Sequence, residues 1–145
     1  MIAVDSNILI YAHRAAVPEH DQAQRALEQA AAHLSGWGIA VPSLAEFWSV
    51  VTHPKCVGRP SRPAEARAFL RGLMEDGGAQ IWYPRQGFGE RLSQMACDLN
   101  LSGVRIFDLQ IALVAFENGA HEIWTHDREF VAMSGLVVRD PLVEP

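Results

Sequence analysis

Short apolar segments that alternate with longer amphipathic ones constrain the fold of this chain more than any other feature. The apolar segments have the length of buried strands, and several of the segments between them carry apolar residues at helical spacing. We expect strands over 2–4, 39–41, 80–82, 122–125 and 136–138, and helices over 19–34, 43–51, 63–75, 89–100 and 108–119. This alternation predicts an α/β fold with a mainly parallel central sheet of four or five strands and helices on both faces.

The length of 145 residues is that of one ordinary domain. The only segment dense in proline and glycine, residues 58–63, is too short for a domain linker. The longest apolar run, residues 111–116, is far shorter than a membrane span, and residues 1–5 lack the basic start of a secretory leader. We therefore expect one domain over 1–145, without a membrane partner and located in the cytoplasm.

The charge balance limits how this chain could bind a nucleic acid. The net charge is -5, whereas proteins that hold phosphates by bulk electrostatics carry clustered Lys and Arg. All but one of the 12 cationic residues are Arg, which suits bidentate contact with phosphate. Any contact with nucleic acid must therefore be local.

Several common catalytic and metal-binding motifs are missing. The two cysteines have no CxxC spacing, and the six histidines form no HExxH motif. The chain also lacks a GxxxxGK[ST] loop, a GxGxxG fingerprint and a GxSxG elbow. Metal-assisted hydrolysis of a phosphodiester by carboxylates is the chemistry that remains.

Four acidic residues each have an ordinary structural explanation when taken alone. Asp5 and Asp127 follow expected strands, where an Asp side chain often bonds the backbone of a turn. Glu46 completes a capping box with Ser43, and Asp108 stands where the next helix needs an N-cap. None of the four therefore identifies a site by itself.

Taken together, the same four acids predict an active site. Two lie at carboxyl ends of strands and two at helix starts that face the same edge of a parallel sheet, where ligands bind in such folds. Crowded carboxylates raise each other's pKa and call for a neutralising cation. Mg²⁺, with Mn²⁺ as a possible substitute, is the cofactor that suits an all-oxygen set of ligands.

At this point the chain resembles the PIN-domain nucleases, and among them the VapC toxins of bacterial toxin–antitoxin systems. The resemblance spans nearly the whole chain and rests on four motifs in the expected order. Residues 2–11 look like the opening motif, 43–47 like the second, 105–112 like the third and 124–130 like the fourth.

The resemblance implies a Mg²⁺-dependent endoribonuclease that cleaves single-stranded regions of RNA and acts as the toxin of a toxin–antitoxin pair. It implies Asp5 and Asp108 as metal ligands, with Glu46 and Asp127 completing the catalytic pocket. Asn7 and Thr125 would be polar support residues. The expected partners are RNA, a cognate antitoxin protein and a second copy of the chain, as a homodimer or higher assembly.

Arginines near the motifs are candidates to hold the substrate's phosphates, namely Arg14, Arg105 and Arg128.

Two other interpretations remain open. The chain could be a catalytically inactive PIN-like domain that binds a protein and uses its acids as caps. It could also be another metal-dependent phosphohydrolase, since an Asp just after the first strand suits aspartyl-phosphate chemistry, although Asn7 stands where a second Asp is expected.

Overall fold

The computed structural model describes residues 1–56 and 58–143, in which strands and helices alternate along much of the chain. The elements in order are β1 (Ile2–Val4), α1 (Ser6–His13), α2 (His20–Ala31), β2 (Trp37–Ala40), α3 (Val41–Val51), α4 (Pro63–Glu75), β3 (Gln80–Trp82), α5 (Phe88–Asp98), α6 (Arg105–Glu117), β4 (Glu122–Trp124) and β5 (Val137–Arg139).

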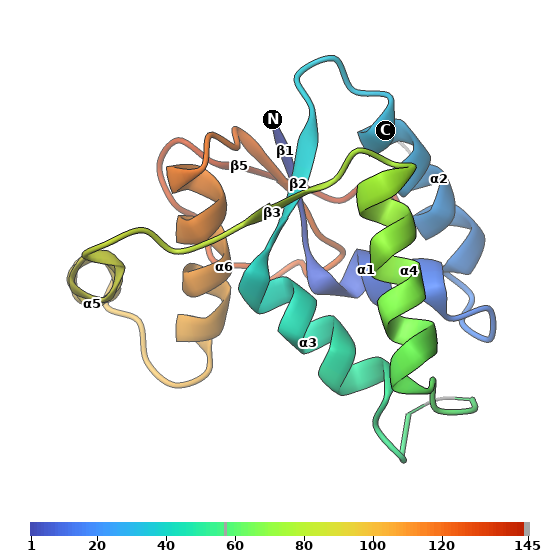
Figure 1. Ribbon diagram of the computed structural model, residues 1–145. Helices are drawn as coiled ribbons and strands as arrows, with labels where there is room; N and C mark the ends of the chain where they lie inside the picture. The colour runs from blue at the N-terminus through green and yellow to red at the C-terminus, as the bar shows by residue number, and fades with distance from the viewer. Residues whose placement is uncertain (57, 144–145) are drawn as a thin grey trace.

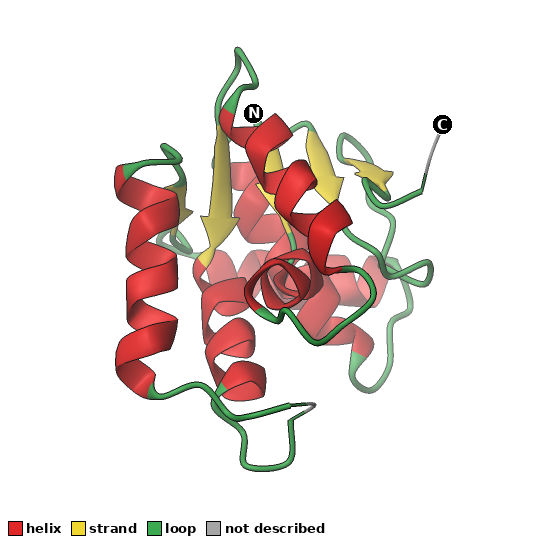
Figure 2. Ribbon diagram, turned by 90° about the vertical axis from the view of Figure 1, so that its right-hand side faces the viewer, coloured by secondary structure: helices red, strands yellow, loops and turns green. Residues whose placement is uncertain are grey.

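All five strands run parallel in one sheet, in the order β3-β2-β1-β4-β5, and their arrows point the same way in Figure 2. The α/β fold expected from the sequence is thereby confirmed. The first strand lies at the centre, with Val4 opposite Trp124 at the end of β4. Asp5 and Thr125, which follow these two residues, therefore emerge side by side at the carboxyl edge of the sheet.

Helices cover both faces of the sheet, which Figure 1 shows nearly edge-on. Helices α1 to α4 supply buried side chains such as Leu9, Leu27 and Phe47 to the core on one face. Helices α5 and α6 supply Phe88 and Val114, among others, to the core on the other face. Alternate residues of a strand point to opposite faces, so β1 contributes to both cores.

One helix and several helix boundaries differ from the sequence-based expectation. Helix α1 was not expected, α3 begins at Val41 rather than at residue 43, and α6 begins at Arg105 rather than at residue 108. Helix α2 ends at Ala31, so Leu34 lies beyond it with a fully exposed side chain rather than on its apolar face. These differences matter because two of the expected site acids lie at the helix starts that moved.

None of the helices formed by residues 1–56 and 58–143 is both long enough and apolar enough to cross a membrane.

Candidate active site

Asp5 is the most deeply buried of the four acids, with 5% of its surface exposed. It is the N-cap of α1, where its Oδ1 accepts a hydrogen bond from the Ser6 amide at 2.8 Å. Its Oδ2 accepts a second from the Thr125 hydroxyl at 2.7 Å. Burial raises the pKa of Asp5 to about 6, the hydrogen bonds from Thr125 and Ser6 oppose that rise, and the charges of Glu46 and Asp108 add to it.

Asn7 and Thr125 join the ends of β1 and β4 through side-chain hydrogen bonds. The Asn7 Nδ2 donates to Thr125 Oγ1 at 2.9 Å and to Asp5 Oδ2 at 3.3 Å. The Asn7 Oδ1 accepts from the His126 amide at 3.1 Å, and Thr125 Oγ1 accepts from the Asp127 amide at 3.1 Å. The orientation of Asp5 is therefore held by Asn7, two positions away, and by Thr125, 120 positions away in the sequence.

Glu46 lies in α3 and points toward the start of α1. Its Oε1 accepts a hydrogen bond from the Ser6 hydroxyl at 2.6 Å. The capping box expected between Ser43 and Glu46 is wrong, because Pro42 in the first turn lets α3 start directly after β2 with Ala40 as N-cap. Ser43 is instead buried within the helix, and its hydroxyl has no hydrogen-bond partner among the residues described. Glu46 is thus free of a cap role and faces Asp5.

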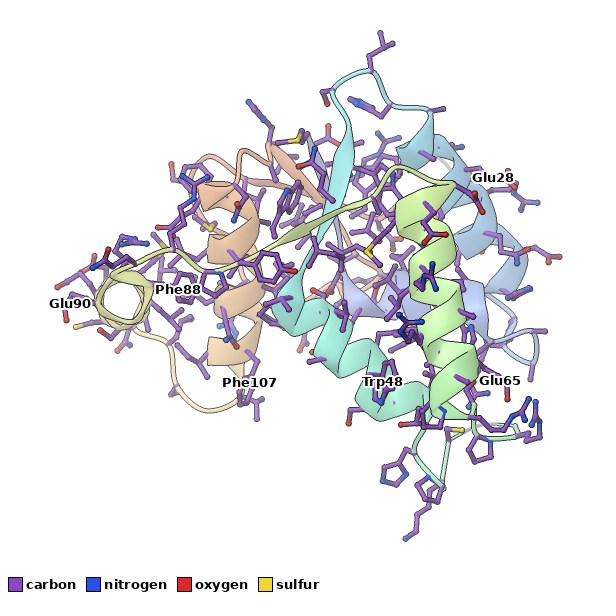
Figure 3. All side chains as sticks on the ribbon, in the orientation of Figure 1. Glu28, Trp48, Glu65, Phe88, Glu90 and Phe107 are labelled. Carbon is purple, nitrogen blue, oxygen red and sulfur yellow. The ribbon has the colours of Figure 1, made fainter. Side chains whose placement is uncertain are left out.

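Asp108 lies in the first turn of α6 and is half-buried. It is not the N-cap that the sequence suggested, because the helix starts three residues earlier, after Val104. Burial raises the pKa of Asp108, the charges of Asp127 and Glu46 raise it further, and Arg105 opposes the rise. The neighbouring Phe107 points out from the end of α6 with 59% of its surface exposed (Figure 3).

Asp127 follows β4 in a turn, and its Oδ1 accepts from the Glu129 amide at 2.9 Å. The turn role expected from the sequence therefore holds, yet Asp127 also lies close enough to Asp108 to influence its pKa. Beside it, the His126 ring bonds Asp140 Oδ2 at 2.8 Å. Sequence reasoning missed Asp140, although it follows β5 just as Asp5 follows β1.

Of the arginines considered for phosphate contact, Arg14 lies away from the acids. It is the C-cap of α1, at the opposite end of the helix from Asp5, and its guanidinium donates to the Val51 carbonyl at 3.1 Å. Arg105 lies close enough to Asp108 to lower its pKa, and Arg128 is exposed next to Asp127. The candidate Arg14 is therefore dropped.

The donor chemistry of the pocket fits a hard divalent cation, because all four side chains offer carboxylate oxygens. Across residues 1–56 and 58–143, however, no three or more His, Cys, Asp or Glu side chains are grouped so that they could hold a metal ion as they stand. Uncompensated carboxylates repel one another, and those of Asp5 and Glu46 turn to hydroxyl and amide donors instead. The four acids Asp5, Glu46, Asp108 and Asp127, which we call the acidic pocket, are close enough to influence one another's charge. They do not yet form a set of ligands around a metal ion.

Comparison with known proteins finds similarity over almost the full chain. The family model of the PIN domain matches residues 2–136. Ribonuclease VapC43 of Mycobacterium tuberculosis is 32% identical over 98% of this chain and 96% of its own.

Two solved structures have a similar fold. The M. tuberculosis VapC20, a Sarcin-Ricin loop cleaving toxin, has a TM-score of 0.67 at 15% identity and covers 90% of this chain and 92% of its own. The VapBC2 structure from Rickettsia felis, bound to a DNA fragment from their promoter, has a TM-score of 0.67 at 21% identity, covering 97% of this chain and 98% of its own.

Proposed function

Because the chain belongs to the PIN-domain family, and within it to the VapC ribonucleases, we propose that it is a metal-dependent endoribonuclease that cleaves single-stranded RNA. We propose further that residues 1–145 form one nuclease domain and act as the toxin of a toxin–antitoxin pair. The observation that carries the proposal is the buried carboxylate of Asp5, held between α1 and Thr125 with Glu46 and Asp108 close enough to raise its pKa.

Asp5 and Asp108 are the residues that would hold a divalent cation, Mg²⁺ or, as a substitute, Mn²⁺. Their raised pKa values reflect the cost of placing negative charges together away from water, and a cation would remove that cost. When bound, such an ion supplies Lewis acidity and a water of lowered pKa.

The remaining residues orient the pocket. Thr125 and Asn7 fix the direction of the Asp5 carboxylate through the bonds at 2.7 and 3.3 Å, and the Ser6 hydroxyl does the same for Glu46 at 2.6 Å. Glu46 and Asp127 flank the two ligand candidates and can accept a proton from, or orient, an attacking water. Arg105 and Arg128, which are near Asp108 and Asp127, would contact phosphates of the bound strand.

We propose a cognate antitoxin as the protein partner and a homodimer or higher assembly as the working form. Four carboxylates with uncompensated charge fit a basic side chain, since a guanidinium binds a carboxylate through two parallel hydrogen bonds. An antitoxin that inserts an arginine would neutralise the pocket and block it to RNA.

The absence of a ready ligand cluster among the described residues favours one competing function, a PIN-like domain that binds proteins without catalysis. Mn²⁺ binding separates the two, because an inactive interaction domain needs none. Aspartyl-phosphate chemistry is less well supported, since both carboxylate oxygens of Asp5 already accept hydrogen bonds.

The test is cleavage of a defined single-stranded RNA and of total RNA, with Mg²⁺ or with a chelator, by the wild type and by Asp5→Asn. We expect cleavage only by the wild type with Mg²⁺. The matched control is Asp98→Asn, an exposed acid of α5 whose side chain bonds Gln94, which should cleave normally. Equal cleavage by all proteins in chelator would contradict the proposal.

A further inference from the structure

Five surface grooves differ in the charges that line them. Four of them contain at least one carboxylate, from Glu65, Glu75, Glu117 or Glu122 among others. The fifth, between α2 and residues 139–143, is lined by two arginines and two glutamines, with no acidic residue among its described lining. It has a volume of about 290 Å³. We infer that this groove, which we call the basic groove, binds backbone phosphates of the RNA strand.

The inference rests on the proposed function and supplies what that function lacks. The acidic pocket repels RNA, and the chain carries a net charge of -5, so substrate binding needs a local cationic anchor. Several other arginines already pair with acids, at 2.5 to 3.2 Å: Arg59 and Arg62 with Glu65, Arg71 with Glu75, and Arg91 with Glu117. The two arginines of the basic groove, Arg25 and Arg139, have no carboxylate partner among the described residues.

Arg139 is held in place by an aromatic ring. Its guanidinium carbon lies 5.5 Å from the centroid of the Trp124 ring, within the range of a cation–π contact. Trp124 is 4% exposed, so the ring is a fixed platform rather than a mobile side chain. Stacking leaves the N–H groups at the guanidinium edge free to bond a phosphate, which is the usual recognition geometry of arginine.

Arg25 lies on the exposed side of α2, and Gln22 and Gln29 flank it along the helix. Residues 22, 25 and 29 are three and four apart, so their side chains share one face of α2. Across the groove from this face of α2 lie Arg139 and residues 141–143. Two guanidinium groups and two amides in one groove suit the oxygens of a phosphodiester.

The basic groove adjoins the acidic pocket through two hydrogen bonds. The Thr125 amide donates to the Arg139 carbonyl at 2.9 Å, and Asp140 bonds the His126 ring at 2.8 Å. Asp140 also accepts from the Leu142 amide at 2.9 Å, so both of its oxygens are engaged. A strand whose scissile phosphate lies at Asp5 would pass over this loop and place a flanking phosphate between Arg25 and Arg139.

The test measures affinity for a labelled single-stranded RNA as a function of salt, in an Asp5→Asn background that cannot cleave it. The double variant Arg25→Gln, Arg139→Gln should bind roughly 10-fold more weakly, with a slope of log affinity against log salt reduced by about 1.4. Arg25→Lys with Arg139→Lys should restore most of the slope, because charge governs it. A control pair, Arg67→Gln with Arg85→Gln, removes two exposed arginines outside the basic groove and should leave both quantities unchanged.

Equal loss of affinity in the two double variants would overturn the inference, because total charge alone would then explain binding. An unchanged affinity for RNA and an unchanged salt slope in the Arg25→Gln, Arg139→Gln variant, with inorganic phosphate bound by the parent protein and not by this variant, would also overturn it and assign the basic groove to small anions. The proposed function fails differently, by an absence of cleavage in the wild type with Mg²⁺. Binding and cleavage therefore report on the two ideas separately.

Discussion

The acidic pocket and the basic groove are linked by the hydrogen bonds of Thr125 with Arg139 and of His126 with Asp140, and they are built in opposite ways. The pocket holds the carboxylate of Asp5, which is 5% exposed and whose pKa is raised mainly by burial and further by neighbouring charges. The groove holds two exposed guanidiniums, those of Arg25 and Arg139. Chemistry and attachment to RNA can thus be separated in one small domain, with a buried carboxylate at the centre of the first and exposed, salt-sensitive charges for the second.

The largest effect expected is a loss of cleavage when the acidic pocket alone is changed. Asp5→Asn should lower the single-turnover cleavage rate by roughly 1000-fold, because it removes a metal-ligand candidate worth about 4 kcal/mol of transition-state stabilisation. Affinity for RNA should stay the same or rise, since a negative charge is lost while the basic groove is intact. Rapid-quench cleavage and polarisation binding measure the two quantities. A parallel fall in cleavage rate and in RNA affinity would show that the acidic pocket and the basic groove do not have separate roles.

The next largest effect is a dependence of the protein's stability on pH, which should also arise from the acidic pocket alone. The pKa of Asp5 is about 6 in the folded chain and near 3.8 when unfolded, so the folded state binds this proton more tightly. Its contribution to stability is full below about pH 3.8 and is lost as pH rises through 6, by roughly 3 kcal/mol. The raised pKa of Asp108 acts in the same direction.

Urea unfolding in chelator between pH 4 and pH 8 measures this dependence. Asp5→Asn should flatten it, and Mg²⁺ at pH 8 should recover part of the lost stability in the wild type. Arg25→Gln with Arg139→Gln should leave the pH dependence as it is. If the free energy of unfolding depended on pH in the same way in the wild type and in Asp5→Asn, Asp5 would not be the source of the pH dependence.

Thr125 lies on the boundary between the two regions and should produce an intermediate effect. Thr125→Val removes the donor to Asp5 and the acceptor of the Asn7 and Asp127 hydrogen bonds. We expect Mn²⁺ affinity, measured by calorimetry, to fall 10- to 100-fold and the free energy of unfolding to fall by about 1–3 kcal/mol. Thr125→Ser keeps the hydroxyl and should retain most of the Mn²⁺ affinity and most of the free energy of unfolding. Equal losses in the two variants would point to packing by the methyl group instead.

The smallest effect is expected at Glu46, on the side of the pocket away from the basic groove. Glu46→Gln should lower the cleavage rate about 10-fold, a loss of about 1.4 kcal/mol, by removing one charge from the pocket. The free energy of unfolding should change by less than about 0.5 kcal/mol, because Glu46 does not cap α3. A loss of stability near 1 kcal/mol with full activity would instead assign Glu46 a structural role through its hydrogen bond with Ser6.

The order of strands and helices could be predicted because apolar periodicity reports burial directly. Helix α1 could not, since apolar residues such as Ile8, Leu9 and Ile10 occupy several sides of it and leave no amphipathic pattern. The starts of α3 and α6 were misplaced because Ser43 and Asp108 are good caps in isolation. Pro42 begins α3 earlier, and Val104 precedes α6 without a side-chain cap.

The four acids could be predicted as site candidates from the sequence, because Asp5 and Asp127 follow strands and the expected starts of two helices fall near Glu46 and Asp108. Their contacts could not be predicted, since the bonds from Ser6 to Glu46 and from His126 to Asp140 join segments that only the packed fold brings together. Arg14 was misjudged because it caps a helix that had not been foreseen. The basic groove could not be predicted either, because Arg25 and Arg139 lie far apart in the sequence.

The hydrogen bond between Thr125 and Asp5 also has a consequence for biosynthesis. It joins residues 120 positions apart, and β1 at the centre of the sheet completes its pairing only when β4 arrives. At translation speeds of about 5–20 residues per second, roughly 6–24 s separate the synthesis of these two residues. During that interval the nascent chain has Asp5 and Glu46 but neither Asp127 nor the support of Thr125. A ribosome that makes this protein therefore carries an incomplete nuclease until the fourth strand has been synthesised.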